Sequence, residues 1–224
     1  MRVVKRSVSL SKAQKIRKTP NRRDGADGII NIYHACRTFG QSERDENLIW
    51  SKEVFFPENL LKRTARTHSL VPDFGLSIIE MRGFYPERFE PNRYGESTWS
   101  NNQSFLKERE TPAWRLIRKE PLFTAKRIRW RNDLESQLKL LSQYRYVPSA
   151  RRVINFLLLA GPHSDWWKKY RYGPIRTGSE GCQIGIYTTN AKYKQDSVIN
   201  FDVVYSIADV SHIGISSAYN PIAQ

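Results

Sequence analysis

The side chains best suited to recognition chemistry in this sequence are concentrated near its C-terminal end. Between Ser197 and His212 the chain contains Tyr, Asn, Asp and Ser but no Lys, Glu, Gln, Met or Trp. The absent types are those that a codon with two randomised positions and a fixed third cytosine cannot encode. A window of this length lacks all of them by chance only about a few per cent of the time, although strands already disfavour Lys and Glu. Tyr offers a large contact area at low entropic cost and small polar residues adapt their hydrogen bonds, so the composition favours ligand binding.

Residues that could perform catalysis or hold a metal form no strong local motif. The four histidines are far apart, at His34, His68, His163 and His212. Neither HAC around His34 nor HSD around His163 supplies a metal ligand set, so we expect satisfied or exposed histidines. Residues 178–185 contain three glycines but lack the Lys-Ser/Thr ending of a phosphate-binding loop, which predicts a turn entering a strand. Neighbouring Lys and Arg should keep Glu108 and Glu110 ionised and solvated.

We therefore expect a non-enzymatic protein without cofactor or metal. Catalytic residues that are distant in sequence can still meet in space, so a hydrolase or nuclease using scattered His and Asp residues is the alternative ranked last.

The charge of the chain makes polyanions its default partners. The formal net charge is +15, and every charged residue from Met1 to Arg23 is Lys or Arg. Residues 1–28 are expected to form a basic flexible arm, and a second basic cluster surrounds Trp130. A solvated tail and a solvated helix start are the structural alternatives. The candidate polyanion-binding residues are Lys12, Lys15, Arg17, Lys18, Arg22, Arg23, Lys126, Arg127, Arg129 and Arg131.

Composition also suggests a compartment. Cys36 and Cys182 are the only cysteines, which excludes a disulfide framework. The basic N-terminal residues have no apolar segment of signal-peptide length, and no window approaches the ~18 apolar residues of a membrane span. We expect a soluble cytoplasmic protein without a membrane span.

The elements that must position the binding residues are partly visible as periodic patterns. Residues 58–68 predict a helix whose Lys62, Arg63 and Arg66 face water. Residues 133–144 carry leucines at helical spacing and predict a second helix.

A further helix is predicted over residues 151–160, after the capping residue Ser149 and before Gly161. The pair Trp166 and Trp167 follows it and is expected to fill the core, with base stacking or an interface as the alternative.

Strand patterns occur in the middle and at the end of the chain. Residues 114–119 alternate apolar and basic side chains, which predicts a strand with Arg115 and Arg118 in solvent. Residues 182–189 and 200–207 also predict strands, the second with Asp202 on its polar side.

Four segments carry a family resemblance. They are VPDFGLSIIEMRGFYPERFEP at 71–91, TPAWRLIRKEPL at 111–122, VPSARRVINFLLL at 147–159 and IGISSA at 213–218. Through them the chain resembles a widespread group of uncharacterised bacterial proteins. The C-terminal part of that group is similar to the variable proteins of diversity-generating retroelements, in which adenine-directed mutagenesis rewrites codons inside a C-type-lectin fold. The sequence departs from the group in its AYNPIAQ ending and its basic arm.

The resemblance implies a fold and a site. The fold is an α+β, C-type-lectin-like single domain over 29–224, with two helices beside a small twisted antiparallel sheet and a C-terminal ligand-binding β segment at about 173–218. The ligand would be an unknown protein or other macromolecule. The implied ligand-binding residues are Tyr187, Thr188, Thr189, Asn190, Asn200, Asp202, Tyr205, Ser206, Asp209, Ser211 and His212. The alternative function is a basic nucleic-acid-associated structural protein, a virion or ribonucleoprotein component.

Overall fold

The structure is a computed structural model. The residues that it describes are 30, 32–41, 56, 58–89, 104–122, 138, 141, 145–161, 164–169, 175–179, 184–190, 197–203, 214–215 and 218–219. Their helices are α2 (Ile32–Thr38), α4 (Glu58–Thr64), α5 (Ile78–Phe84), α7 (Ala150–Ala160) and α8 (Asp165–Lys169), with short 3-10 turns η1 (Pro86–Arg88) and η3 (Ser104–Leu106). Their strands are β1 (His68–Asp73), β2 (Ala113–Arg118), β3 (Arg145–Tyr146), β4 (Ile175–Arg176), β5 (Ile184–Asn190), β6 (Ser197–Val203), β7 (Gly214–Ile215) and β8 (Ala218–Tyr219).

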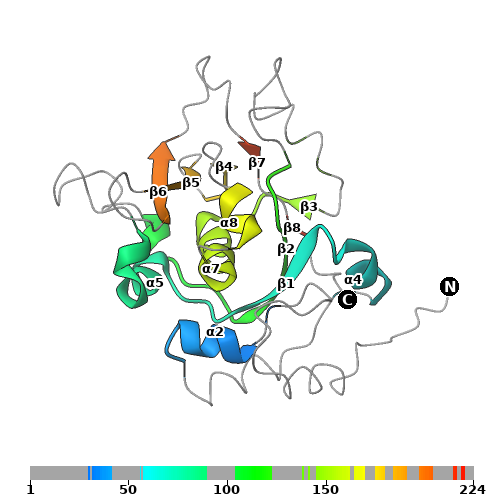
Figure 1. Ribbon diagram of the computed structural model, residues 1–224, viewed down its shortest axis with the longest axis horizontal. Coiled ribbons are helices and arrows are strands. Elements are labelled where there is room, and N and C mark those ends of the chain that lie inside the picture. The colour runs from blue at the N-terminus through cyan, green and yellow to red at the C-terminus, as the bar shows by residue number, and fades with distance from the viewer. Residues whose placement is uncertain are drawn as a thin grey trace.

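The strands form two separate sheets, and α7 contacts both. One sheet has the order β1-β2-β8-β3 and is antiparallel throughout, whereas the other has the order β6-β5-β4-β7 and contains one parallel pair, β4 with β7. Helix α7 contacts β1 of the first sheet and β5 of the second, and also α2, α5 and α8 (Figure 1). The mixed α+β class is thus confirmed, but the described part of the chain has more helices, and one more sheet, than expected.

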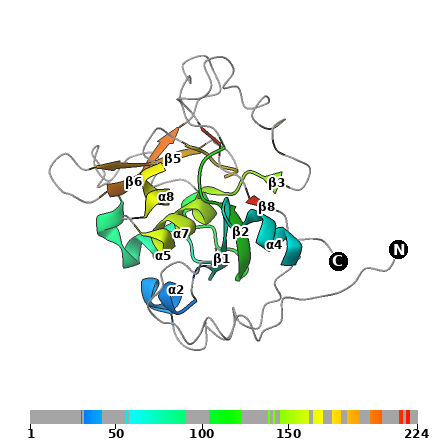
Figure 2. The same cartoon turned by 45° about the vertical axis from the view of Figure 1, so that its right-hand side comes forward.

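The C-terminal IGISSA segment joins the two sheets. Its first part forms β7, which pairs with β4, and its last residue opens β8, which lies between β2 and β3. Only two residues separate β7 from β8 in sequence, and Figure 2 shows β8 beside β3 in the first sheet.

Helix α7 forms where its sequence predicts it. The Ser149 hydroxyl accepts a hydrogen bond from the Arg152 backbone N–H, and Gly161 ends the helix at φ 77°. The helix interior is buried on nearly every side, which its apolar run requires. Trp167 is fully buried and Trp166 stacks on Phe156 with ring centroids 5.5 Å apart, so the prediction that the Trp pair fills the core is confirmed.

Strands β1 and β2 pair along their whole lengths. Pro72 lies inside β1, which is compatible with a sheet only because β1 is an edge strand and needs no outward donor there. The predicted strand at 114–119 is confirmed as β2, but its expected solvent face is wrong at Arg115, whose side chain is 14% exposed. The helix predicted at 58–68 is confirmed over its first part as α4, but residues 65–67 form a turn and His68 begins β1. Lys62, Arg63 and Arg66 are exposed as predicted.

Other predictions fall outside the described residues. Of the helix predicted over 133–144, only Leu138 and Leu141 are described; Leu138 is helical and 42% exposed. The basic arm, residues 1–28, lies wholly outside them. Among the described helices, none has the length and apolar character needed to cross a membrane.

Candidate functional site

A buried ion pair lies at the junction of β1 and α7. Asp73 ends β1 and Arg151 stands in the first turn of α7, and both side chains are almost completely buried. The Arg151 Nη1 and Nη2 atoms donate to the two Asp73 carboxylate oxygens at 2.8 and 2.7 Å. The Gly75 backbone N–H donates to the same carboxylate at 2.9 Å. This two-pronged geometry fixes the start of α7 against the end of β1.

Glu110 extends the pair into a network, which we call the arginine network: Asp73, Glu110, Arg115, Arg151 and Arg152. Arg151 Nε donates to Glu110 Oε1 at 3.1 Å, and Arg152 Nε donates to Glu110 Oε2 at 2.8 Å. Arg115 bridges the two acids, because its Nη2 lies 3.0 Å from Glu110 Oε2 and its Nε lies 3.3 Å from Asp73 Oδ2.

The arginine network is charged at neutral pH. Burial alone would raise the pKa of Asp73, but hydrogen bonding to Arg151 and the charges of Arg151 and Arg115 outweigh it, and the pKa lies below its ordinary value. The pKa of Glu110 is lowered in the same way, against its own desolvation, by Arg152 and Arg151. The prediction that Glu110 is ionised is therefore supported, but the expected solvation is wrong because arginines replace most of the water around it.

The arginine network is built to hold elements together rather than to react. Its carboxylates have pKa values below their ordinary values, so both stay ionised at neutral pH, and both already accept hydrogen bonds from arginines. The donors of Arg152 are also occupied, since its Nη1 donates to the Tyr146 hydroxyl at 2.7 Å. We interpret this network as the scaffold of the site and not as its reacting centre.

The predicted ligand-binding residues meet on the β5–β6 ladder. In the register of these antiparallel strands, Tyr187 lies opposite Asn200 and Gly185 opposite Asp202. Residues directly opposite each other share a face, and alternate residues along a strand share it too. Four predicted residues therefore occupy one face, which we call the Tyr187 face: Tyr187, Thr189, Asn200 and Asp202.

The opposite side of the ladder faces the core. Ile199 is fully buried in the hydrophobic core. Thr188 lies opposite Ile199 in the register, and Asn190 lies opposite Ser197, which is on the same side of β6 as Ile199. We call this side the Ile199 face. The register thus divides the predicted set, with Thr188 and Asn190 at positions on the core side. Val198, on the Tyr187 face, is only 8% exposed, so that face is covered near its Thr189 end.

The remaining predicted site residues lie outside the described part of the chain. For the ligand-binding set these are Tyr205, Ser206, Asp209, Ser211 and His212. For the polyanion-binding set they are Lys12, Lys15, Arg17, Lys18, Arg22, Arg23, Lys126, Arg127, Arg129 and Arg131.

The two described histidines have structural partners. His34 Nε2 lies 3.0 Å from the Leu159 carbonyl oxygen, and His68 Nδ1 lies 2.8 Å from the Thr67 hydroxyl. This confirms the expectation of a satisfied histidine for His34 and, at the Nδ1 atom, for His68. No group of three or more potential metal ligands occurs among the residues that were described.

Comparisons with models of protein families, with curated proteins and with solved structures found no match for this chain. The sequence patterns did not predict the arginine network. Three of the four segments that carry the family resemblance nevertheless contribute to it: residues 71–91 supply Asp73, residues 111–122 supply Arg115, and residues 147–159 supply Arg151 and Arg152.

Proposed function

We propose that this chain is a non-enzymatic binding protein that contacts a macromolecular ligand through the Tyr187 face. The observation that carries the proposal is the β5–β6 register, which puts Tyr187 opposite Asn200 and makes Asp202, two residues further along β6, its diagonal neighbour. A Tyr with small polar neighbours suits recognition, because the ring gives rigid contact area and the polar groups adapt to the partner.

The scaffold beneath this face supports the proposal. Ile199 is buried in the core, and Phe89 bridges to it at the outer edge of β6. Helix α7 contacts β5 and is itself fixed to β1 by the Asp73–Arg151 pair. A stiff support lowers the entropic cost of binding, and it allows surface residues to vary without loss of the fold.

The finer identity that we propose is a variable protein of the diversity-generating retroelement type, with a C-type-lectin-like fold. Its support is the sequence resemblance and the codon-restricted composition of residues 197–212. A genomic observation tests this identity directly. We expect, beside a reverse transcriptase, a near-copy of the DNA encoding residues 185–217 that differs mainly at adenines. A genome without such a copy would contradict active diversification.

Binding by the Tyr187 face can be tested without knowing the natural ligand. In one phage-displayed library of the full chain, Tyr187, Thr189, Asn200 and Asp202 are randomised. In the matched control library the randomised positions are Thr188, Asn190, Phe201 and Val203, which lie on the Ile199 face. Most members of the first library should remain folded, and selection on immobilised hen lysozyme should enrich binders from it alone. An equal loss of folded protein in both libraries would contradict the proposal, because the Tyr187 face would then tolerate substitution no better than the Ile199 face.

Salt separates this function from the nucleic-acid alternative. Contacts through Tyr and neutral polar groups should change little with ionic strength, whereas each neutralised phosphate releases counterions and makes affinity fall steeply with salt. Binding of the unselected chain to duplex DNA with an affinity that falls steeply with salt would favour the nucleic-acid alternative.

A further inference from the structure

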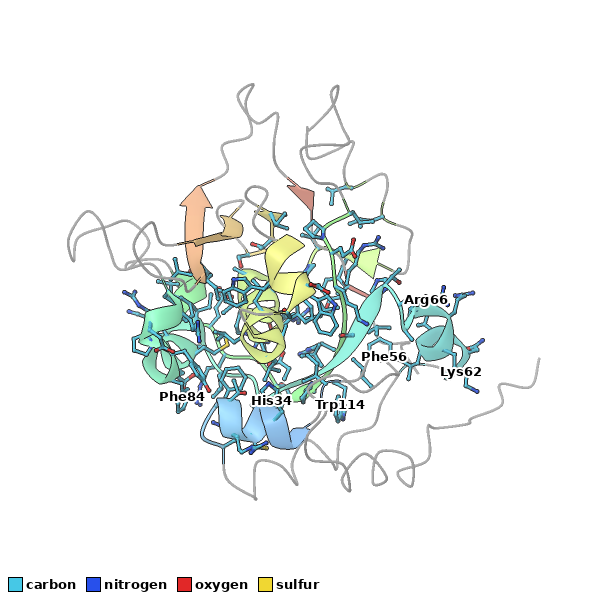
Figure 3. The ribbon with its side chains drawn as sticks, viewed as in Figure 1. His34, Phe56, Lys62, Arg66, Phe84 and Trp114 are labelled. Atoms are coloured by element: carbon cyan, nitrogen blue, oxygen red, sulfur yellow. The ribbon has the colours of Figure 1, made fainter. Side chains whose placement is uncertain are left out.

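The exposed side of α4 carries positive charge that the proposed ligand site does not use. We call this surface the α4 basic face: Lys62, Arg63, Arg66 and Lys119. The first three are exposed, and Figure 3 shows Lys62 and Arg66 at the outer edge of the structure. Residues 58–67 hold three cations, Lys62, Arg63 and Arg66, and one acid, Glu58, so this segment has a local charge of +2.

The structure holds this surface in a fixed position. Thr64, the last residue of α4, is buried, and the partly buried Leu60 and Leu61 of the same helix pack against the core. Lys119, at the end of β2, donates from Nζ to the Ala65 carbonyl oxygen at 2.8 Å, and its backbone N–H donates to the Thr67 carbonyl oxygen at 2.9 Å. The turn that carries Arg66 is therefore tied to the β1–β2 sheet.

Two arginines on this surface have no partner within the described part of the chain. The guanidinium groups of Arg63 and Arg66 make no ion pair or hydrogen bond there, in contrast to the three arginines of the network, which all do. Each free guanidinium presents five N–H donors in a planar arrangement that matches phosphate oxygens.

The chemistry of the surface indicates its partner. The large exposed apolar side chains among the described residues are Ile79, Phe84 and Leu138, and none of them belongs to α4 or its following turn. A protein partner would require aromatic or aliphatic anchors at the centre of the contact. Phosphate contacts require only basic and polar donors, which is what residues 59–67 expose.

We propose that the α4 basic face binds the phosphate backbone of nucleic acid. This site is separate from the Tyr187 face, because α4 and the β5–β6 ladder lie at opposite ends of the described structure in both views (Figures 1 and 2). The two proposals can therefore fail independently.

The test measures binding of the full chain to a random-sequence duplex DNA at several salt concentrations. The double variant Arg63→Gln with Arg66→Gln should show a shallower salt dependence, with the negative slope of log affinity against log salt reduced in magnitude by about 1.8. Its affinity for DNA at low salt should be about tenfold or more weaker. The matched control, Arg37→Gln with Lys107→Gln, removes the same charge from exposed positions elsewhere. It should leave the slope nearly unchanged.

Two results would overturn the proposal. One is an equal change in both variants, which would show that only total charge matters. The other is a loss of binding to poly-glutamate with DNA binding intact, which would show that the face serves acidic proteins. Thermal melting of each variant confirms that a change in affinity is not a change in folding, since both pairs are exposed.

Discussion

At the scale of single residues, we expect stability to depend most on the buried charged side chains. Asp73 and Arg151 are almost fully buried, and each compensates the other. Replacing Asp73 by Asn keeps the shape but leaves the Arg151 charge without its main counterion. Breaking one side of a buried pair costs about 3 to 5 kcal/mol. We therefore expect Asp73→Asn to lower the free energy of unfolding by an amount in that range, as measured by urea denaturation.

An exposed pair provides the control for this prediction. Arg109 binds Glu80 on the surface, with 65% of the Arg109 side chain exposed. Arg109→Gln should have a much smaller effect, because water replaces the lost partner. Similar losses in the two variants would show that the Asp73–Arg151 pair is not important for stability.

Two glycines should respond in opposite directions to the same substitution. Gly75 has φ +77°, and an added Cβ would lie 1.9 Å from the Glu110 carbonyl oxygen. We expect Gly75→Ala to destabilise by more than the ~1 kcal/mol that the backbone conformation alone costs. Gly83 lies in α5 with nothing within 4 Å of an added Cβ, so Gly83→Ala should stabilise by up to about 1 kcal/mol. Thermal denaturation measures both; a stable Gly75→Ala variant would contradict the close approach.

At the scale of elements, a second polar contact, besides the Asp73–Arg151 pair, holds α7 against β1. Asn155 is buried in the helix and donates from Nδ2 to the Pro72 carbonyl oxygen at 3.2 Å. Asn155→Ala would leave that buried carbonyl unpaired, which costs about 1 to 3 kcal/mol. We expect a loss of this size in urea denaturation. Asn59→Ala, at an exposed position of α4, serves as the control and should change stability little.

The sequence predicts elements where local patterns are sufficient. Helix α7 follows from a cap, an apolar run and a terminal glycine, and α4 and β2 follow from their periodicity. The position of Arg115 could not be predicted this way. An alternation of apolar and basic residues normally leaves the basic side chains exposed to water. Arg115 is instead mostly buried, because it donates a hydrogen bond to Asp73, which lies 42 residues earlier in the chain.

The candidate sites show the same division. The sequence identifies the residues of the Tyr187 face, but only the register separates them from Thr188 and Asn190, since that depends on how β5 and β6 pair. The arginine network joins positions as far apart as Asp73 and Arg151, which are separated by 78 residues. Likewise, Lys62, Arg63 and Arg66 have an ordinary pattern for a solvated helix. Only the fold brings Lys119 beside them.

At the scale of the whole molecule, charge is distributed unevenly. The first 23 residues include no acid, and no Lys or Arg follows Lys194. The α4 basic face and the Tyr187 face lie at opposite ends of the described structure. The two proposed binding surfaces therefore belong to different parts of the described structure, and we expect a polyanion bound at α4 not to compete with a ligand on the Tyr187 face.

The same charges determine how the molecule responds to acid. In the folded state the pKa of Glu80 is lowered to about 2, mainly by its hydrogen bond to Arg109, and the pKa values of Asp73 and Glu110 are also below their ordinary values. The unfolded chain therefore binds more protons than the folded chain as pH falls through the ordinary carboxylate range. The stabilisation from these groups is complete above that range and is lost as pH falls towards their folded pKa values.

We expect the free energy of unfolding to be nearly constant from about pH 7 to about pH 5.5 and to decline steeply below that. Glu110→Gln removes one of the titrating groups, so its decline should be shallower than that of the unaltered protein, although its stability at pH 7 should be lower. Urea denaturation at a series of pH values measures both quantities. Parallel curves for the two proteins would show that Glu110 has the same pKa folded and unfolded, and the arginine network would then not lower the pKa of this carboxyl.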